Sequence, residues 1–292
     1  MANTQETAEV ELAGGVRIPQ VGFGTFMIPA SETQAAVEQA LAIGYRHIDT
    51  AAAYLNEEGV GRALAAFGRE GVFVTTKLPN YRQGYDETLH AFEDSRSKLG
   101  IDVVDLYLIH WPSPARDAYP DSFRAMQRLR DEGAVRAIGV CNFLPEHLDR
   151  LKRECGELPC VDQIESHPRY WQPELDAFCQ GKGIRIEAYS PLGHGQDITS
   201  EPVEAAAAAH GVSCGQVVLR WHLQKGHVVI PKSVHESRMR ENLDLGGFEL
   251  TQAEMDAISA LNSEGMRVGN DPHTFEKDQS PEDMAARGTA TL

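Results

Sequence analysis

The sequence predicts an α/β protein, a closed (β/α)8 barrel that opens with a short N-terminal β-hairpin. Short runs of β-branched residues alternate with helical patterns eight times, which is typical of parallel strands joined by right-handed crossovers. No linker-like stretch interrupts residues 10–262. A doubly wound sheet would also fit the alternation, but eight units in about 250 residues favour a barrel. We therefore expect residues 1–292 to form one domain, with a C-terminal tail from about residue 263.

The strands are predicted from β-branched runs bounded by turn residues. Residues 10–12 and 17–19 flank Ala13-Gly14-Gly15-Val16, which indicates the starting hairpin. The eight barrel strands are expected at residues 20–23, 46–49, 72–75, 106–109, 137–140, 161–164, 184–188 and 228–230.

The helices are predicted from apolar residues at helical spacing. Ser31-Glu32-Thr33-Gln34 has the pattern of a capping box and predicts a helix start, as does Thr251-Gln252-Ala253-Glu254. The apolar faces of further helices are marked by Leu89, Phe92 and Leu99; Phe123, Met126 and Leu129; Leu148 and Leu151; Leu175 and Phe178; and Val218 and Trp221.

Charge and composition limit the classes of partner. The 43 acidic and 27 basic side chains give a net charge of −16, which repels nucleic-acid backbones and anionic membranes. The longest apolar runs are about five residues, far below the ~20 of a membrane helix, and the polar N-terminus does not resemble a signal peptide. Five cysteines without C-x-x-C spacing indicate reduced thiols. We expect a cytoplasmic monomer that binds neither nucleic acid nor membranes.

Polar or titratable residues follow almost every predicted strand. In barrels of this kind the chemistry lies at the C-terminal ends of the strands, and strand interiors here are apolar. The residues at those ends are Asp49, Lys77, His110, Cys141, Asn142, Gln163, Tyr189 and Lys232.

Three of these groups, together with Tyr54 in a neighbouring loop, suit the donation of a proton to a carbonyl oxygen while another group attacks its carbon. Tyr54 lies just beyond Asp49, and an adjacent ammonium such as Lys77 is expected to lower the pKa of its phenol. Asp49 can pair with that lysine, and His110 can orient a polar oxygen. Each residue alone also fits a structural role, and His47 with Asp49 leaves a metal-dependent hydrolase barrel as a rival, although no second metal-ligand cluster is present.

A basic segment at residues 230–242 is the second signal. Lys232, Ser233 and Arg238 combine a point charge, a hydroxyl and a guanidinium near a helix start, which predicts a phosphate site. The stretch from Gly22 to Met27 lacks the third glycine of G-x-G-x-x-G, so no Rossmann fingerprint is present. A bound dinucleotide would therefore lie across the barrel mouth.

Six stretches of the sequence together form a specific pattern. They are Gly44-Tyr45-Arg46-His47-Ile48-Asp49-Thr50-Ala51 with Tyr54, Thr75-Thr76-Lys77, Leu106-Tyr107-Leu108-Ile109-His110-Trp111-Pro112, Ile138-Gly139-Val140-Cys141-Asn142-Phe143, Gln163-Ile164-Glu165 with His167-Pro168, and Ile230-Pro231-Lys232-Ser233. Through these stretches the chain resembles the aldo-keto reductases over residues 10–262. The short length and the ending Arg267-Val268-Gly269-Asn270-Asp271-Pro272 look most like the bacterial 2,5-diketo-D-gluconate reductases.

The resemblance implies an NADPH-dependent carbonyl reductase, or alternatively an NADPH-binding sensor or scaffold with little turnover. It implies a catalytic tetrad of Asp49, Tyr54, Lys77 and His110, with Tyr54 as proton donor. It implies cofactor contacts from Gly24, Thr25, Asp49, Cys141, Asn142, Gln163, Tyr189, Ser190, Leu192, Gly193, Lys232, Ser233, Val234, Arg238, Glu241 and Asn242, and substrate contacts from Phe26, Tyr54, Pro79, Asn80, His110 and Trp111. No metal is implied.

Two positions depart from the family pattern. Cys141 stands where serine usually contacts the carboxamide, and a thiol there should react with thiol reagents in the free enzyme. Asp162 stands where asparagine usually precedes the glutamine. Because neighbouring strand residues face opposite ways, Asp162 need not reach the cofactor.

Overall fold

The strands form the predicted barrel. The computed structural model describes residues 8–263, 265–275 and 277–283. An antiparallel hairpin of β1 (Glu9–Glu11) and β2 (Arg17–Pro19) comes first. Eight parallel strands then follow in sequential order: β3 (Phe23–Gly24), β4 (His47–Asp49), β5 (Phe73–Leu78), β6 (Val104–Ile109), β7 (Val135–Cys141), β8 (Val161–Glu165), β9 (Arg185–Tyr189) and β10 (Val228–Val229).

A short seam closes the barrel between its first and last strands. Val21 forms a parallel bridge with Val229. The Gly22 amide donates to the Val229 carbonyl at 2.8 Å, and the Val229 amide donates to the Gln20 carbonyl at 2.9 Å. These bonds join residues 20–22, which precede β3, to β10 and so complete the ring of strands. The closed barrel predicted from the eight repeats is therefore confirmed.

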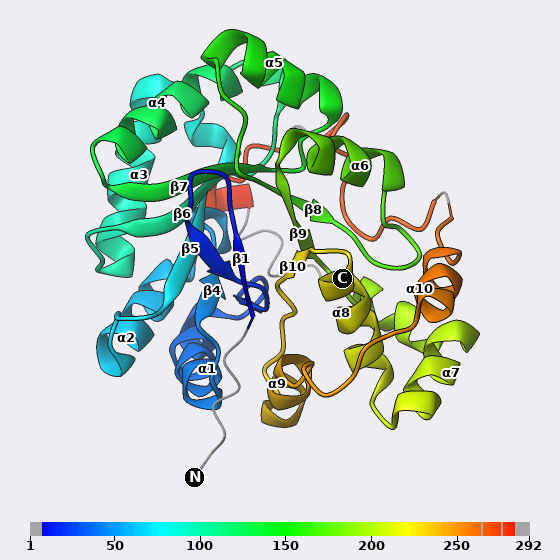
Figure 1. The fold of residues 1–292 in the computed structure, drawn as a ribbon. Helices are drawn as coiled ribbons and strands as arrows, with labels where there is room; N and C mark the ends of the chain where they lie inside the picture. Colours follow the sequence, from blue (N-terminus) through cyan, green and yellow to red (C-terminus); the bar gives the residue numbers. More distant parts are fainter. Residues whose placement is uncertain (1–7, 264, 276, 284–292) are drawn as a thin grey trace.

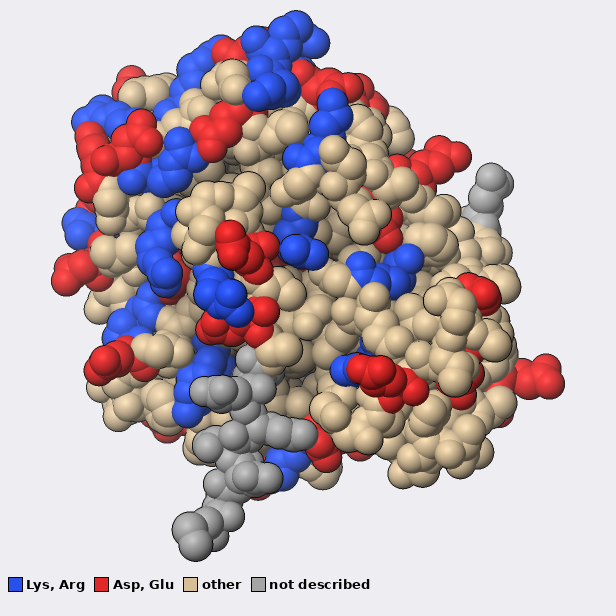
Figure 2. Space-filling model, in the orientation of Figure 1, with Lys and Arg blue, Asp and Glu red and all other residues tan. Residues whose placement is uncertain are grey.

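The helices surround the strands (Figure 1). They are α1 (Ala30–Ile43), α2 (Glu57–Phe67), α3 (Tyr85–Leu99), α4 (Tyr119–Asp131), α5 (Pro145–Cys155), α6 (Pro173–Lys182), α7 (Glu201–His210), α8 (Cys214–Gln224), α9 (Glu236–Leu243) and α10 (Gln252–Ser259). Basic and acidic side chains are interspersed over α2–α5 on the face seen in Figure 2. No helix in the described part of the chain is long and apolar enough to cross a membrane.

One of the two predicted capping boxes is wrong. Helix α1 begins at Ala30 after Pro29, so Ser31 lies inside the first turn, and the Thr33 hydroxyl donates to the Pro29 carbonyl at 2.9 Å. The rigid φ of proline sets the helix start here without a side-chain cap. At α10 the prediction is confirmed, because Thr251 and Glu254 exchange side-chain-to-backbone hydrogen bonds.

The hairpin and the C-terminal segment lie at opposite ends of the barrel. Leu12 and Ile18 of the hairpin segment pack with Phe73 and Leu106 in an apolar cluster that fills the N-terminal end. At the other end, the Phe275 ring lies 4.2 Å from that of Trp111. Residues 264, 276 and 284–292 of the predicted tail lie outside the described residues. The C-terminal segment thus crosses the end of the barrel where the polar residues predicted at the strand ends lie.

Candidate active site

A buried ion pair lies at the centre of the site. Lys77 Nζ donates to both oxygens of Asp49, at 2.7 and 2.8 Å, and to the Thr50 carbonyl at 2.8 Å. Burial alone lowers the pKa of the Lys77 ammonium, but the Asp49 carboxylate raises it above its ordinary value. Lys77 therefore stays cationic although no solvent reaches it.

Tyr54 completes a chain of contacts from the ion pair to the mouth. It ends the 3₁₀ turn Ala52–Tyr54 after β4, and its hydroxyl oxygen accepts a hydrogen bond from Lys77 Nζ at 3.2 Å. The rings of Phe26 and His110 lie 5.0 and 5.7 Å from the Tyr54 ring. Asp49, Lys77 and His110, predicted at the ends of three strands, are thus brought together with Tyr54.

The predicted direction of the Tyr54 pKa is wrong. Burial raises the pKa of the Tyr54 phenol well above its ordinary value, and the opposing effect of Lys77 is smaller. Sequence alone could not weigh these effects, because it does not show that Tyr54 is partly withdrawn from solvent beside the buried ion pair. Tyr54 is therefore a fully protonated donor, which gives up its proton only to a strongly basic oxygen.

Asn142 ties three strand ends together. Its backbone has a φ of 62°, a left-handed conformation that asparagine tolerates better than most residues. Its Nδ2 donates to the His110 carbonyl at 3.1 Å, and its Oδ1 accepts from the Tyr189 hydroxyl at 2.9 Å. The Asn142 side chain therefore links the backbone at the end of β6 to the Tyr189 side chain at the end of β9.

Gln163 joins two carboxyl groups inside the barrel. Its Nε2 donates to Asp49 Oδ2 at 2.9 Å and to Glu187 Oε2 at 2.8 Å. Burial, followed by the Asp49 charge, raises the pKa of Glu187 to about 8. Sequence reasoning missed Glu187, although a glutamate between Ile186 and Ala188 in a buried parallel strand is itself a signal.

Both departures from the family pattern are buried. Cys141 is 1% exposed, and burial raises the pKa of its thiol well above the ordinary value, against the influence of Lys77. The thiol is thus poorly placed to react with reagents from solvent, contrary to the expectation from sequence. Asp162 accepts from the Phe143 amide at 3.3 Å, away from Gln163, as the strand alternation predicted.

The predicted phosphate segment lies beside the barrel seam. Lys232, Val234 and Arg238 are exposed, while the Ser233 hydroxyl accepts from the His235 amide at 3.1 Å. The Gly24 amide donates to the Pro231 carbonyl at 3.4 Å, which brings the predicted contacts on β3 next to this segment.

The other predicted cofactor contacts are engaged within the protein. Thr25 donates through both its amide and its hydroxyl to the Asp49 carbonyl, each at 3.0 Å. Glu241 accepts from the Ser213 hydroxyl, and Asn242 is buried near the end of α9. The further predicted contacts in the loop after β9 are Ser190, Leu192 and Gly193.

The C-terminal segment covers part of the predicted substrate surface. Asn80 Nδ2 donates to the Lys277 carbonyl at 2.9 Å, and the adjacent Pro79 is also buried. Trp111 is covered by Phe275, whereas Phe26 is 44% exposed. Sequence patterns gave no signal for this cover, because it depends on where a tail docks.

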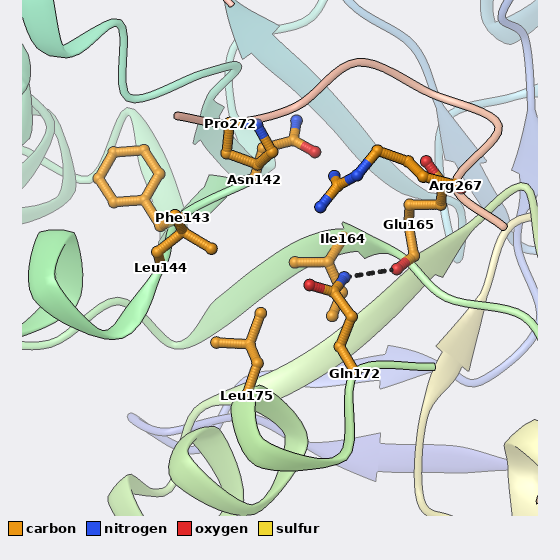
Figure 3. A pocket seen from close by; sticks show the side chains of 9 residues that line it. All are labelled: Asn142, Phe143, Leu144, Ile164, Glu165, Gln172, Leu175, Arg267 and Pro272. Carbon is orange, nitrogen blue, oxygen red and sulfur yellow. Dashed lines mark hydrogen bonds between the residues drawn. The ribbon is translucent and has the colours of Figure 1, made fainter. Parts of the chain in front are cut away.

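A buried carboxylate anchors that segment, and a histidine and a second carboxylate lie next to it. Glu165 accepts from the backbone amides of Val268 and Gly269 at 2.6 and 2.8 Å. His167 lies between Glu165 and Asp197, at 3.3 and 2.8 Å, and these neighbours raise its pKa to about 9 despite its burial. In Figure 3, Glu165 and Arg267 border a small cavity of about 10 Å³.

Within the described residues, no group of three or more His, Cys, Asp or Glu side chains is placed to hold a metal ion. All five cysteines are unpaired. The site therefore consists of an ion pair, a phenol, amide side chains and nearby exposed cations.

Comparisons with known proteins identify the family. The model of the aldo/keto reductase family matches residues 20–263. An aldo-keto reductase of Mycobacterium sp. (strain KMS) is 50% identical over 268 residues, 91% of this chain and 97% of the relative. The glyoxal reductase of Bacillus subtilis (strain 168) is 47% identical over 266 residues, 90% of this chain and 95% of the relative.

A solved structure supports the same assignment. A variant of Gox0644 in complex with NADPH matches with a TM-score of 0.90 at 43% identity, covering 92% of this chain and 98% of that one. This chain belongs to the aldo/keto reductase family.

Proposed function

We propose that this protein reduces aldehydes and ketones to alcohols with NADPH as the hydride donor. The observation that carries the proposal is the buried contact chain from Asp49 through Lys77 Nζ to the Tyr54 hydroxyl, at 2.7 and 3.2 Å. The bound NADPH in the solved relative supports the choice of cofactor.

The residues present fit such a cofactor. Lys232 and Arg238 are exposed cations beside the Ser233 hydroxyl, which suits a 2′-phosphate. Asn142, Gln163 and Tyr189 surround the strand ends where a nicotinamide would lie. NADPH, when bound, supplies the hydride.

The protein residues supply the proton and hold the charges in place. Tyr54 keeps its proton until the carbonyl oxygen becomes basic, and then transfers it to that oxygen. The Lys77 ammonium, held by Asp49, stabilises the phenolate that remains. His110, whose ring lies 5.7 Å from that of Tyr54, is placed to orient the carbonyl oxygen.

Two substrate classes are proposed for this site. The glyoxal reductase relative points to small α-dicarbonyl compounds, and the sequence resemblance points to diketo-sugar acids such as 2,5-diketo-D-gluconate. Phe26, Trp111 and Phe275 line the mouth with aromatic rings that exclude water around a small carbonyl.

A substrate panel followed at 340 nm tests the proposal. It should include glyoxal, methylglyoxal, 2,5-diketo-D-gluconate and a simple aldehyde, and we expect NADPH oxidation with at least one of them. If the protein binds NADPH but none of these carbonyls oxidises it in a single turnover, the protein is a binding module and not a reductase.

Cofactor choice gives a second test. We expect about a 10²-fold preference for NADPH over NADH, because charge-assisted hydrogen bonds contribute about 1.5–3 kcal/mol each. Arg238→Ala should reduce the preference, mainly through weaker NADPH binding. Arg240→Ala is the matched control, because Arg240 pairs with Glu236 on the same helix. Equal efficiency with both cofactors in the unmodified protein would rule out the proposed phosphate site.

We also propose that the protein acts as a monomer in the cytoplasm. All the site residues come from one chain, and the five unpaired thiols suit a reducing compartment. Size-exclusion chromatography coupled to light scattering, with an expected mass of 32.1 kDa, checks the first statement.

A further inference from the structure

Glu187 and Gln163 lie side by side in the barrel interior. They are register partners on the neighbouring parallel strands β8 and β9, and neither is accessible to solvent. Gln163 Nε2 donates to Glu187 Oε2 and Asp49 Oδ2 at 2.8 and 2.9 Å. The Oε1 atom of Gln163 accepts no hydrogen bond from the described residues.

This arrangement fixes the direction of the Gln163 amide. An amide nitrogen carries two hydrogens to donate, whereas the amide oxygen can only accept. Next to the Asp49 carboxylate only the nitrogen fits, because a flipped amide would place its oxygen against an ionised oxygen that cannot donate. Without Glu187, the second buried N–H would have no partner, and the amide would be held at one point instead of two.

The surroundings of Glu187 leave it without a cation of its own. Lys77 is bound by Asp49, and the neutral His47 imidazole lies 3.6 Å from Glu187 Oε1, its pKa lowered to about 3 by burial. The Cys141 thiol on β7 is buried nearby, and Val228 is the register partner on β10.

Glu187 is therefore mostly protonated at neutral pH, in line with its raised pKa. A carboxylic acid keeps an oxygen that accepts the Gln163 hydrogen bond, so the contact does not require a second buried negative charge.

We propose that Glu187 is a positioning residue: with Asp49 it holds the Gln163 amide nitrogen inward, so that the amide oxygen is presented to the amino group of the nicotinamide carboxamide. The inference rests on the proposed function, since it concerns how the protein holds NADPH. It assigns Glu187 a role in cofactor binding through another residue.

The experiment measures binding without turnover. Dissociation constants for NADPH and for reduced 3-acetylpyridine adenine dinucleotide phosphate are obtained from quenching of tryptophan fluorescence. The analogue keeps a carbonyl but has a methyl group in place of the amino group, so it cannot donate to Gln163 Oε1. Loss of one neutral hydrogen bond predicts that the unmodified protein binds NADPH about 3- to 10-fold more tightly than the analogue.

Three variants separate positioning from stability. Glu187→Met removes the acceptor and should bring the ratio of the two dissociation constants to about 1–2. Glu187→Gln should restore the ratio, because its amide oxygen accepts the same hydrogen bond. Glu57→Leu removes another buried glutamate, one that accepts from the Thr76 hydroxyl at 2.7 Å, and should leave the ratio unchanged even if its Tm falls.

The outcomes distinguish this inference from the proposed function. A wild-type ratio in Glu187→Met, or in Glu187→Leu if the methionine variant does not fold, overturns the positioning role. Equal binding of NADPH and the analogue by the unmodified protein also overturns it, while the proposed function stands. If the unmodified protein does not bind NADPH at all, both are refuted.

Discussion

Two buried polar clusters lie one above the other along β8, and they hold their protons on different groups. The interior cluster consists of Asp49, Lys77, Gln163 and Glu187, and the rim cluster of Glu165, His167 and Asp197. Gln163 and Glu165 are two residues apart on one strand and so face the same side. All seven side chains are buried.

Hydrogen-bond partners differ between the two clusters. In the rim cluster, Glu165 accepts from two backbone amides and Asp197 from the Arg169 amide at 2.8 Å, and against its burial these two neighbours raise the pKa of His167. In the interior cluster, the described residues offer Glu187 one hydrogen bond, from the Gln163 side chain, while burial and the Asp49 charge raise its pKa. The proton is therefore held by the histidine in the rim cluster and by a carboxyl group in the interior cluster.

The largest expected effect is on turnover, and it should arise beside the interior cluster and not at the rim. Tyr54→Phe should lower the turnover number by about 10²–10⁴, the usual contribution of a general acid, with little change in the dissociation constant of NADPH. Tyr170→Phe is the matched control, because that hydroxyl bonds to Arg267 at the rim. Steady-state kinetics at 340 nm should give a turnover number for Tyr170→Phe within a few-fold of that of the unmodified enzyme. More than about a tenth of normal turnover in Tyr54→Phe would assign the donor elsewhere.

The interior cluster predicts that ionising Glu187 reduces stability. Its pKa rises from 4.5 in the unfolded chain to about 8 in the fold, so the folded state holds a proton that the unfolded state has lost between these pH values. Stability should fall relative to Glu187→Gln by up to about 1.4 kcal/mol per pH unit across that window. Urea unfolding at pH 5 and pH 8.5 measures it, and a constant difference between the two proteins would contradict the prediction.

The rim cluster predicts that protonation of His167 increases the stability of the fold. The pKa of His167 rises from 6.5 to about 9, so its contribution is fully present below pH 6.5 and is lost as the pH rises through 9. His167→Gln should therefore cost about 3 kcal/mol at pH 6 and little at pH 10. The same unfolding assay compares the two pH values. His210→Gln, at a half-buried pair with Glu254, is a control with a smaller expected cost.

The sequence predicted most of what lies at the strand ends. Asp49, Lys77 and His110 could be found because a barrel brings the C-terminal ends of its strands together, whatever the loop conformations. Tyr54 was placed correctly, but the direction of its pKa was not, because the enclosure of its ring depends on Phe26 and other residues distant in sequence.

The parts that escaped prediction depend on long-range docking. The cover over Asn80 and Trp111 comes from Lys277 and Phe275, about 165–200 positions along the chain, and no local pattern encodes that contact. Glu187 was missed because it lies inside a strand and not at its C-terminal end. A charged residue within an apolar parallel strand therefore indicates a polar partner nearby, as Gln163 is here.

The seam has a consequence for local opening of the barrel. It joins residues 20–22, which precede β3, to the two-residue strand β10, whereas β6 and β7 pair over five register positions. The amides of Gly22 and Val229 should therefore exchange hydrogen with solvent sooner than those of the β6–β7 ladder. Gly24 and Lys232 lie on opposite sides of this seam. A dinucleotide that contacts both would therefore hold the first and last strands together, and its release would make local opening at the seam easier.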